Sequence, residues 1–173
     1  MTGAFPSAAA INVITLHIMS NREVENKVRK ELELAGVESP DLLRVSEFGK
    51  LPYLQACITE GLRLNPPITQ LRERVVPAGG DTVDGHYIPG GTNIGLNTQA
   101  VGRHACFGPD PDHFRPERWL EANEESLVMM RKVHSLMFGY GSTKCLGINQ
   151  AVMIITKTVG AVSNTWKYYR VGC

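Results

Sequence analysis

Phe138-Gly-Tyr-Gly-Ser-Thr-Lys-Cys145-Leu-Gly147 sets a single cysteine in a glycine-rich loop, directly before the apolar run 151–162 that is typical of a helix. The first N–H groups of a helix have no partner within it, and the helix dipole adds positive potential there. Such a place favours a thiolate, which makes the Cys145 sulfur a ligand rather than an inert core atom. Gly141 and Gly147 have no side chain, so a flat cofactor can approach the backbone on either side of the sulfur. Phe138 would cover the apolar flank of the cofactor ring.

This stretch resembles the cysteine-ligand loop of the cytochrome P-450 haem-thiolate monooxygenases, Phe-x-x-Gly-x-Arg-x-Cys-x-Gly. Every fixed position matches except one, because Thr143 stands where the family usually has arginine. The resemblance implies haem b as cofactor, with Cys145 as the axial ligand of its iron and with Phe138, Gly141 and Gly147 around the ring. On its own, the stretch is more typical of a buried cysteine in a glycine-rich turn, so two further motifs decide between these interpretations.

Glu60 and Arg63 form the second motif, on a predicted helix that covers 53–64. At a spacing of three residues, a carboxylate and a guanidinium lie on one helix face and can pair bidentately. A buried pair of this kind needs a third partner for its remaining hydrogen-bonding groups. The third motif, at residues 114–119, resembles the family's Pro-Glu-Arg meander, which implies that Arg118 completes a structural triad supporting the cysteine loop. For Arg118, the alternative is a surface arginine in a polar loop.

The segment 79–92 predicts a β-hairpin, because Asp84-Gly85 is typical of a two-residue turn and β-branched or aromatic residues flank it. In the family, similar strands line the haem pocket, and an arginine just before them binds a haem propionate. Arg74 matches this position, and Arg72 is the alternative. A solvated charge on a strand explains Arg74 equally well.

Residues 7–19 are mostly apolar and predict a buried helix end, followed by an exposed, charged helix over 21–34. This region resembles the end of the family's oxygen-binding helix, in which an acid followed by a threonine delivers protons to bound dioxygen. The alignment puts Phe5 and Pro6 at those positions. Neither side chain can carry a proton, and proline tends to break a helix, so no catalytic residue is identified. The alternative, which we favour because the resemblance fades there, is that residues 1–6 are foreign sequence from a wrong start or splice boundary.

The composition suits one soluble globular domain, with 173 residues of which 43% are hydrophobic and a formal net charge of +1. A nearly neutral chain without a long basic run gives no reason to expect a nucleic-acid partner. The four cysteines form no Cys-x-x-Cys pair and do not cluster with histidine as zinc ligands do. The five histidines are scattered, and each is expected at the surface or in a helix cap.

The resemblance implies a mainly α fold with small β-sheets (α+β), the C-terminal part of the cytochrome P-450 fold. The expected elements are the end of the oxygen-binding helix, the Glu-x-x-Arg helix, a β-hairpin, the meander, the cysteine-ligand loop and the following helix. Residues 1–173 would form a single partial domain, the C-terminal third of a member nearest to fungal microsomal ones. In such a fragment, the helices over 53–64 and 151–162 are expected to expose apolar faces.

For the intact protein, the resemblance implies insertion of one oxygen atom of dioxygen into a small apolar organic substrate. It also implies an NADPH-dependent flavoprotein reductase as electron donor and an endoplasmic-reticulum membrane location, with the anchor outside this chain. Two alternatives stay open. The chain is either a truncated or degenerate fragment that binds haem weakly through Cys145 without activating oxygen, or a haem-free structural piece.

Overall fold

The structure is a computed structural model that describes residues 3–36 and 50–165, so Cys173 lies outside the described residues. Short 3-10 turns at Ala105–Phe107, Leu136–Phe138 and Gly141–Thr143 join several of its elements. In chain order the helices and strands are α1 (Ala4–Ser20), α2 (Arg22–Leu34), α4 (Pro52–Leu64), β1 (Arg72–Val75), β2 (Asp81–Val83), β3 (His86–Ile88), β4 (Asn93–Leu96), α5 (Thr98–Val101), α6 (Arg118–Glu121), α7 (Glu124–Ser135) and α8 (Ile148–Thr165).

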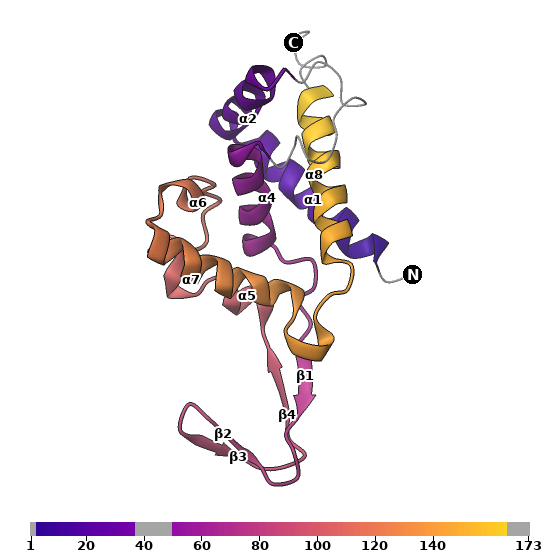
Figure 1. The fold of residues 1–173 in the computed structure, drawn as a ribbon, viewed down its shortest axis with the longest axis vertical. Coiled ribbons are helices and arrows are strands. Elements are labelled where there is room, and N and C mark those ends of the chain that lie inside the picture. The colour runs from indigo at the N-terminus through magenta and orange to yellow at the C-terminus, as the bar shows by residue number, and fades with distance from the viewer. Residues whose placement is uncertain (1–2, 37–49, 166–173) are drawn as a thin grey trace.

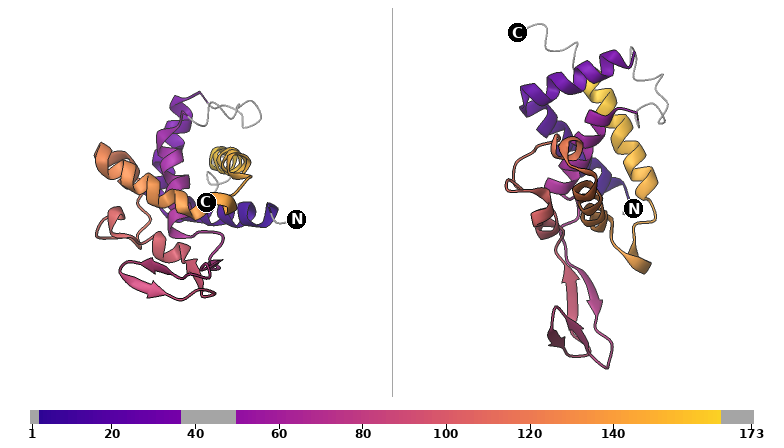
Figure 2. Two further views of the ribbon diagram at one scale, coloured as in Figure 1. Left: turned by 60° about the horizontal axis from the view of Figure 1, so that its bottom comes forward. Right: turned by 60° about the vertical axis from the view of Figure 1, so that its left-hand side comes forward.

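Helices α1, α2, α4 and α8 pack into a helical body, and the strands extend from it as an arm (Figures 1 and 2). Each of the four helices contributes a fully buried side chain to one core: Ile14, Val28, Leu54 and Val159. Gly61 allows α1 and α4 to approach closely, because a Cβ atom there would lie 2.5 Å from Cγ1 of Ile14. This core fixes α8, and α8 in turn fixes the end of the cysteine loop.

The arm consists of two small antiparallel sheets, in which β1 pairs with β4 and β2 pairs with β3. Asp84 and Gly85 connect β2 to β3 with φ angles of 51° and 78°. Positive φ at both central residues defines the two-residue turn that Asp-Gly favours. The predicted hairpin and the mainly α, α+β fold class are therefore confirmed.

Three expectations about the helices need correction. Pro6 does not break α1, because it lies in the first turn, where its missing N–H would have no helical partner. Helix α4 is buried along most of its length, since α1, α2, α6 and α8 all contact it. Helix α2 is exposed on one face only and packs its other face into the core. Helix α8 does expose apolar side chains as expected, with Met153 at 40% and Ile154 at 47%.

Glu31 of α2 caps the start of α4. Its carboxylate accepts hydrogen bonds from the backbone N–H of Tyr53 at 2.7 Å and of Leu54 at 2.8 Å. We expect Glu31→Ala to lower the free energy of unfolding by about 1–3 kcal/mol, because it leaves donors at a helix start without a partner. Denaturant unfolding measures this change. Lys30→Ala, on the exposed side of α2, should cost less than about 0.5 kcal/mol, and equal losses for the two variants would contradict the capping role.

Candidate functional site

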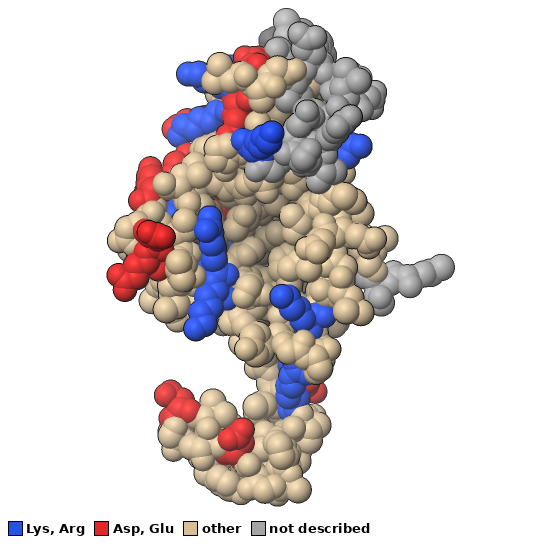
Figure 3. Space-filling model, viewed as in Figure 1, with Lys and Arg blue, Asp and Glu red and all other residues tan. Residues whose placement is uncertain are grey.

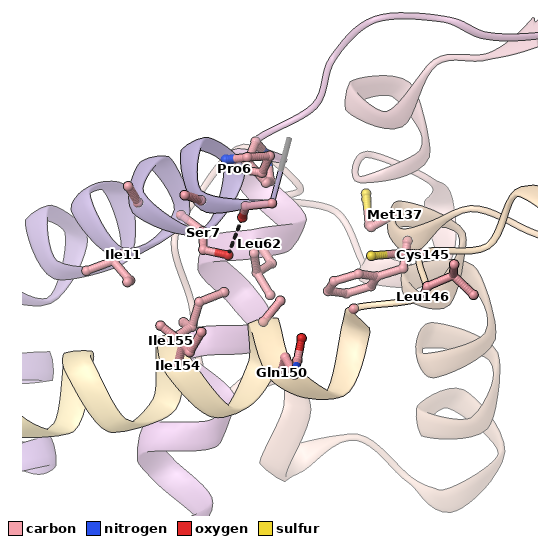
Figure 4. A pocket seen from close by; sticks show the side chains of 18 of the residues that line it. Pro6, Ser7, Ile11, Leu62, Met137, Cys145, Leu146, Gln150, Ile154 and Ile155 are labelled. Atoms are coloured by element: carbon pink, nitrogen blue, oxygen red, sulfur yellow. Dashed lines mark hydrogen bonds between the residues drawn. The ribbon is translucent and has the colours of Figure 1, made fainter. Parts of the chain in front are cut away.

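The cysteine loop leads from α7 to α8 and is held in shape by its own backbone. The N–H of Cys145 donates to the carbonyl oxygen of Phe138 at 2.8 Å. Gly139 and Gly141 have φ angles of 81° and 65°, in the left-handed region that favours glycine. The Cys145 side chain is exposed, and its sulfur points toward the space between the start of α1 and the start of α8 (Figure 4).

A cavity of about 760 Å³ lies on this side of the loop. Its walls come mainly from α1, the first turns of α8 and the loop itself, and most of the side chains that line it are apolar (Figure 4). Phe138, Cys145 and Gly147 line the cavity, whereas Arg74 and Gly141 do not. The structure thus brings the predicted ligand, the predicted aromatic cover and one of the two predicted glycines to one cavity.

The start of α1 supplies the wall across from the cysteine. Phe5 does not line the cavity and is 77% exposed, whereas Pro6 and Ser7 do line it. The Ser7 hydroxyl donates to the carbonyl oxygen of Gly3 at 3.2 Å, and it is the one hydroxyl among the described residues of the cavity wall. The two positions that align with the acid and the threonine therefore present no proton-carrying side chain to the cavity.

Glu60, Arg63 and Arg118 come together in the interior. The Arg63 guanidinium donates through Nε and Nη2 to the two Glu60 oxygens, at 2.8 and 2.9 Å. Arg118 donates through Nε to Glu60 Oε1 at 2.8 Å. Glu60 and Arg63 are fully buried, and Arg118 is 7% exposed. Further donors of both arginines reach backbone carbonyl oxygens, which include those of Gly102 and Phe107, so two cations and one anion are enclosed, and each of their side-chain nitrogen and oxygen atoms makes at least one hydrogen bond.

Two further donors to Glu60 were not predicted from the sequence. The indole N–H of Trp119 donates to Oε2 at 2.9 Å, and the backbone N–H of Arg115 donates to Oε1 at 3.0 Å. A buried tryptophan usually finds a partner for its N–H, so the Trp119 next to Arg118 was the available signal. Burial alone would raise the pKa of Glu60, but the bonds and charge of Arg63, with help from Arg115 and Arg118, outweigh it and hold this pKa below its ordinary value.

A row of rings connects the Glu60 cluster to the cysteine loop. The Trp119 ring meets the His134 ring edge-on at a centroid distance of 5.4 Å, and His134 meets Phe138 at 6.4 Å. Because Trp119 also binds Glu60, each ring is placed by the one before it. His134 was expected at the surface or in a cap, and that expectation is wrong, since its Nε2 is shielded from solvent and has no hydrogen-bond partner among the described residues.

Both arginines of β1 reach the cysteine loop, but they do different things there. Arg74 is exposed and donates to the carbonyl oxygen of Tyr140, at 2.8 Å, and to the hydroxyl of Thr143. Arg72 is half-buried and donates to the carbonyl oxygen of Met137 at 2.9 Å. Only Arg72 of the two lines the cavity.

Comparison with known proteins agrees with these motifs. The family model described as cytochrome P-450 matches residues 1–162. The chain is 40% identical over 161 residues to the cytochrome P-450 monooxygenase ABA1 of Pyricularia oryzae, covering 91% of this chain and 31% of that relative. It is 44% identical to the cytochrome P-450 monooxygenase mfmA of Annulohypoxylon moriforme, over 77% of this chain and 26% of the relative. It is 37% identical to pisatin demethylase of Fusarium vanettenii, over 91% of this chain and 30% of that relative.

The matched region thus includes the cysteine loop and the Glu60 cluster, and the chain spans about a third of the length of these relatives. A match over most of the chain, joined to this arrangement of motifs, shows the family. The chain belongs to the cytochrome P-450 monooxygenases.

Proposed function

We propose that the protein of which this chain forms all or part is a haem-thiolate monooxygenase. It inserts one oxygen atom of dioxygen into a small apolar organic substrate, and Cys145 is the axial ligand of the haem iron. The observation that supports this most is the Cys145 sulfur on the wall of a mainly apolar cavity of about 760 Å³. Ligand cavities in proteins commonly measure about 300–1,000 Å³ and are mostly apolar with few polar groups.

The residues around Cys145 suit a haem. Phe138 lines the same cavity as the sulfur, and a Cβ atom added at Gly147 would meet no atom within 4 Å, so the wall is open there. Gly141 supports the loop through its left-handed backbone rather than by lining the cavity. A haem with a thiolate ligand supplies electron density that favours cleavage of the O–O bond of dioxygen.

The chain's own groups position the cysteine loop and supply an apolar wall across the cavity from it. The Glu60–Arg63–Arg118 cluster fixes Trp119, and through His134 and Phe138 it supports the loop from behind. The apolar start of α1 covers the cavity opposite the sulfur. Phe5 and Pro6 supply no proton, and this favours a second candidate function, a chain that binds haem through Cys145 without activating oxygen.

For the complete protein, we propose electrons from an NADPH-dependent flavoprotein reductase and a location at the endoplasmic-reticulum membrane. The exposed Arg131, Lys132 and Lys144 are candidates for the reductase contact. On the face drawn in Figure 3, basic and acidic side chains are scattered among uncharged surface. Within the described ranges, no helix has the length and apolar character needed to cross a bilayer.

The test is a haem titration of the full 173-residue chain, followed by a spectrum of the reduced chain with carbon monoxide. We expect a thiolate-type spectrum for the unchanged chain and for Cys106→Ala, which removes a cysteine outside the cavity wall. Cys145→Ala should lose that spectrum, because no other cysteine lines the described cavity. A thiolate-type spectrum that survives in Cys145→Ala would contradict the proposal. Turnover with a reductase then separates the monooxygenase from the second candidate.

A further inference from the structure

Helix α7 lies at the side of the helical body and has one buried and one exposed face (Figures 1 and 2). Its buried face packs Met130, with the partly buried Leu127 and Val133, against the apolar cluster around Trp119. On the exposed face, Val128 is 60% and Met129 is 47% exposed. Two exposed apolar side chains are ordinary on a protein surface, so the meaning of this face depends on the charges around them.

The charges on the exposed face of α7 are ordered by sign. Glu125 lies one turn before Val128 and Met129, and Lys132 lies one turn after them, so the four side chains form one stripe on the helix. All four are exposed. Glu125 and Lys132 are two turns apart, about 10 Å along the axis, whereas pairs within a helix form between residues one turn apart. Neither side chain forms an ion pair within residues 3–36 and 50–165.

A second pair of charges repeats this order next to the stripe. Glu124 lies in the first turn of α7 and Arg131 lies near its end, and both are exposed. Among the described residues, neither has an ion-pair partner. The exposed face is therefore acidic at its start, apolar in its middle and basic at its end. A partner of one sign would match one half of this face and repel the other half.

We propose that the stripe Glu125–Val128–Met129–Lys132 is the contact surface for a second copy of this chain, with the two α7 helices antiparallel. A twofold axis between Val128 and Met129 would place Glu125 of each copy next to Lys132 of the other, with the apolar side chains between the two ion pairs. Parallel helices would instead set like charges against each other, so the charges determine the orientation.

The pair is expected to be weak, and it would affect the reductase contact. One helix of 12 residues provides less surface than a stable dimer needs, so the Kd should lie at about 10 μM to 1 mM. The pair would cover Arg131 and Lys132, which are also candidates for the reductase contact. Self-association and that contact would therefore exclude one another. The dimer itself depends on α7 alone and requires neither haem nor the proposed oxygen chemistry.

The first measurement is sedimentation velocity of the full 173-residue chain at concentrations around the expected Kd. The dimer should weaken as salt is added, because exposed ion pairs are screened. Glu125→Lys and Lys132→Glu each turn two attractive contacts into two repulsive ones, so each should weaken the dimer about tenfold or more. Lys30→Glu makes the same change of charge on the exposed side of α2 and should leave the dimer unchanged.

The second measurement mixes the two charge-reversed variants. The stripe of Glu125→Lys is basic at both ends and that of Lys132→Glu is acidic at both ends, so the mixture should form a heterodimer about tenfold or more tighter than either variant alone. One chain with both changes should dimerise like the unchanged chain. Both changes oppose the helix dipole, so circular dichroism must show that each variant is folded. If either unfolds, Glu125→Gln and Lys132→Gln remove the attraction instead and should each weaken the dimer.

Three outcomes would overturn the inference: an unchanged chain that stays monomeric, self-association that strengthens with salt, or a mixture that binds no tighter than its components. Association that strengthens with salt would indicate an apolar contact elsewhere, for which the exposed Met153 and Ile154 of α8 are the candidates. A chain that forms the dimer but binds no haem would contradict the proposed function and leave this inference standing.

Discussion

Replacing Glu60 with glutamine is expected to lower the free energy of unfolding by about 3–5 kcal/mol, the usual cost of removing one partner from a buried charge cluster. Glu60 is paired with two buried guanidinium groups and accepts four side-chain and one backbone hydrogen bonds, from Arg63, Arg118, Trp119 and Arg115. Glutamine keeps the shape but loses the charge, and its amide would turn two hydrogens toward donors. The arginines would then remain buried without an anion.

Denaturant unfolding of the two chains measures this loss, and Glu121→Gln is the matched control. Glu121 also pairs with an arginine, Arg115, but both side chains are more than half exposed. Exposed pairs contribute about 0–1 kcal/mol, so the control should change stability by no more than that. If Glu60→Gln does not fold at all, this agrees with the expected loss of stability. Glu60→Asp, which keeps the charge, should then recover part of the folded structure that Glu60→Gln loses. A loss for Glu60→Gln no larger than that of the control would contradict the role of the cluster.

The sequence predicts best those local structures that are determined by residues adjacent in the chain. Asp84-Gly85 is enough for the hairpin turn, because the backbone preferences of two residues decide it. The loop that carries Cys145 and the helix after it also follow from one continuous stretch. The meeting of Glu60 with Arg118 joins positions 58 residues apart, and here family motifs supplied what local patterns do not contain.

What the sequence missed depends on tertiary neighbours. The capping of α4 by Glu31 joins two helices through a side chain that looks like any exposed glutamate in a charged helix. The burial of α4 was wrongly predicted because an apolar pattern does not say how many neighbouring helices will cover it. Which of Arg72 and Arg74 faces the cavity was equally undecided, since both lie on the same face of one strand.

His134 shows most clearly how tertiary packing overrides an ordinary expectation for a residue type. His104 does act as a cap, with Nδ1 accepting from the N–H of Cys106 at 3.2 Å. His134 instead stands between Trp119 and Phe138, with Nε2 enclosed and unpaired. Burial lowers the pKa of His134 from 6.5 to about 4, and the Arg63 charge adds to this. A hydrogen bond with the Thr59 backbone and the charge of Glu60 act in the opposite direction.

Acidification from pH 8 to 4.5 is therefore expected to lower the free energy of unfolding by about 2–3 kcal/mol through His134 alone. Below pH 6.5 the unfolded chain protonates this ring, whereas the folded chain resists protonation until about pH 4. The unfolded state then binds more protons, so stability is complete above pH 6.5 and falls as the pH drops. Glu60 and Glu117 have pKa values below the ordinary 4.5, so most of the stability that they contribute is lost only below pH 4.5. The change in stability between pH 8 and 4.5 is therefore assigned to His134.

Denaturant unfolding at several pH values between 8 and 4.5 measures this slope, and two variants assign it. His134→Phe keeps a ring between Trp119 and Phe138 but cannot titrate, so its stability should vary with pH by about 2–3 kcal/mol less over this range. His86→Phe removes an exposed histidine of β3 and should keep the full slope of the unchanged chain. If the free energy of unfolding of His134→Phe depends on pH as strongly as that of the unchanged chain, a group other than His134 causes the dependence. A flat profile for the unchanged chain would mean that His134 is protonated in the folded state as readily as in the unfolded chain, because only a difference between the two states makes stability depend on pH.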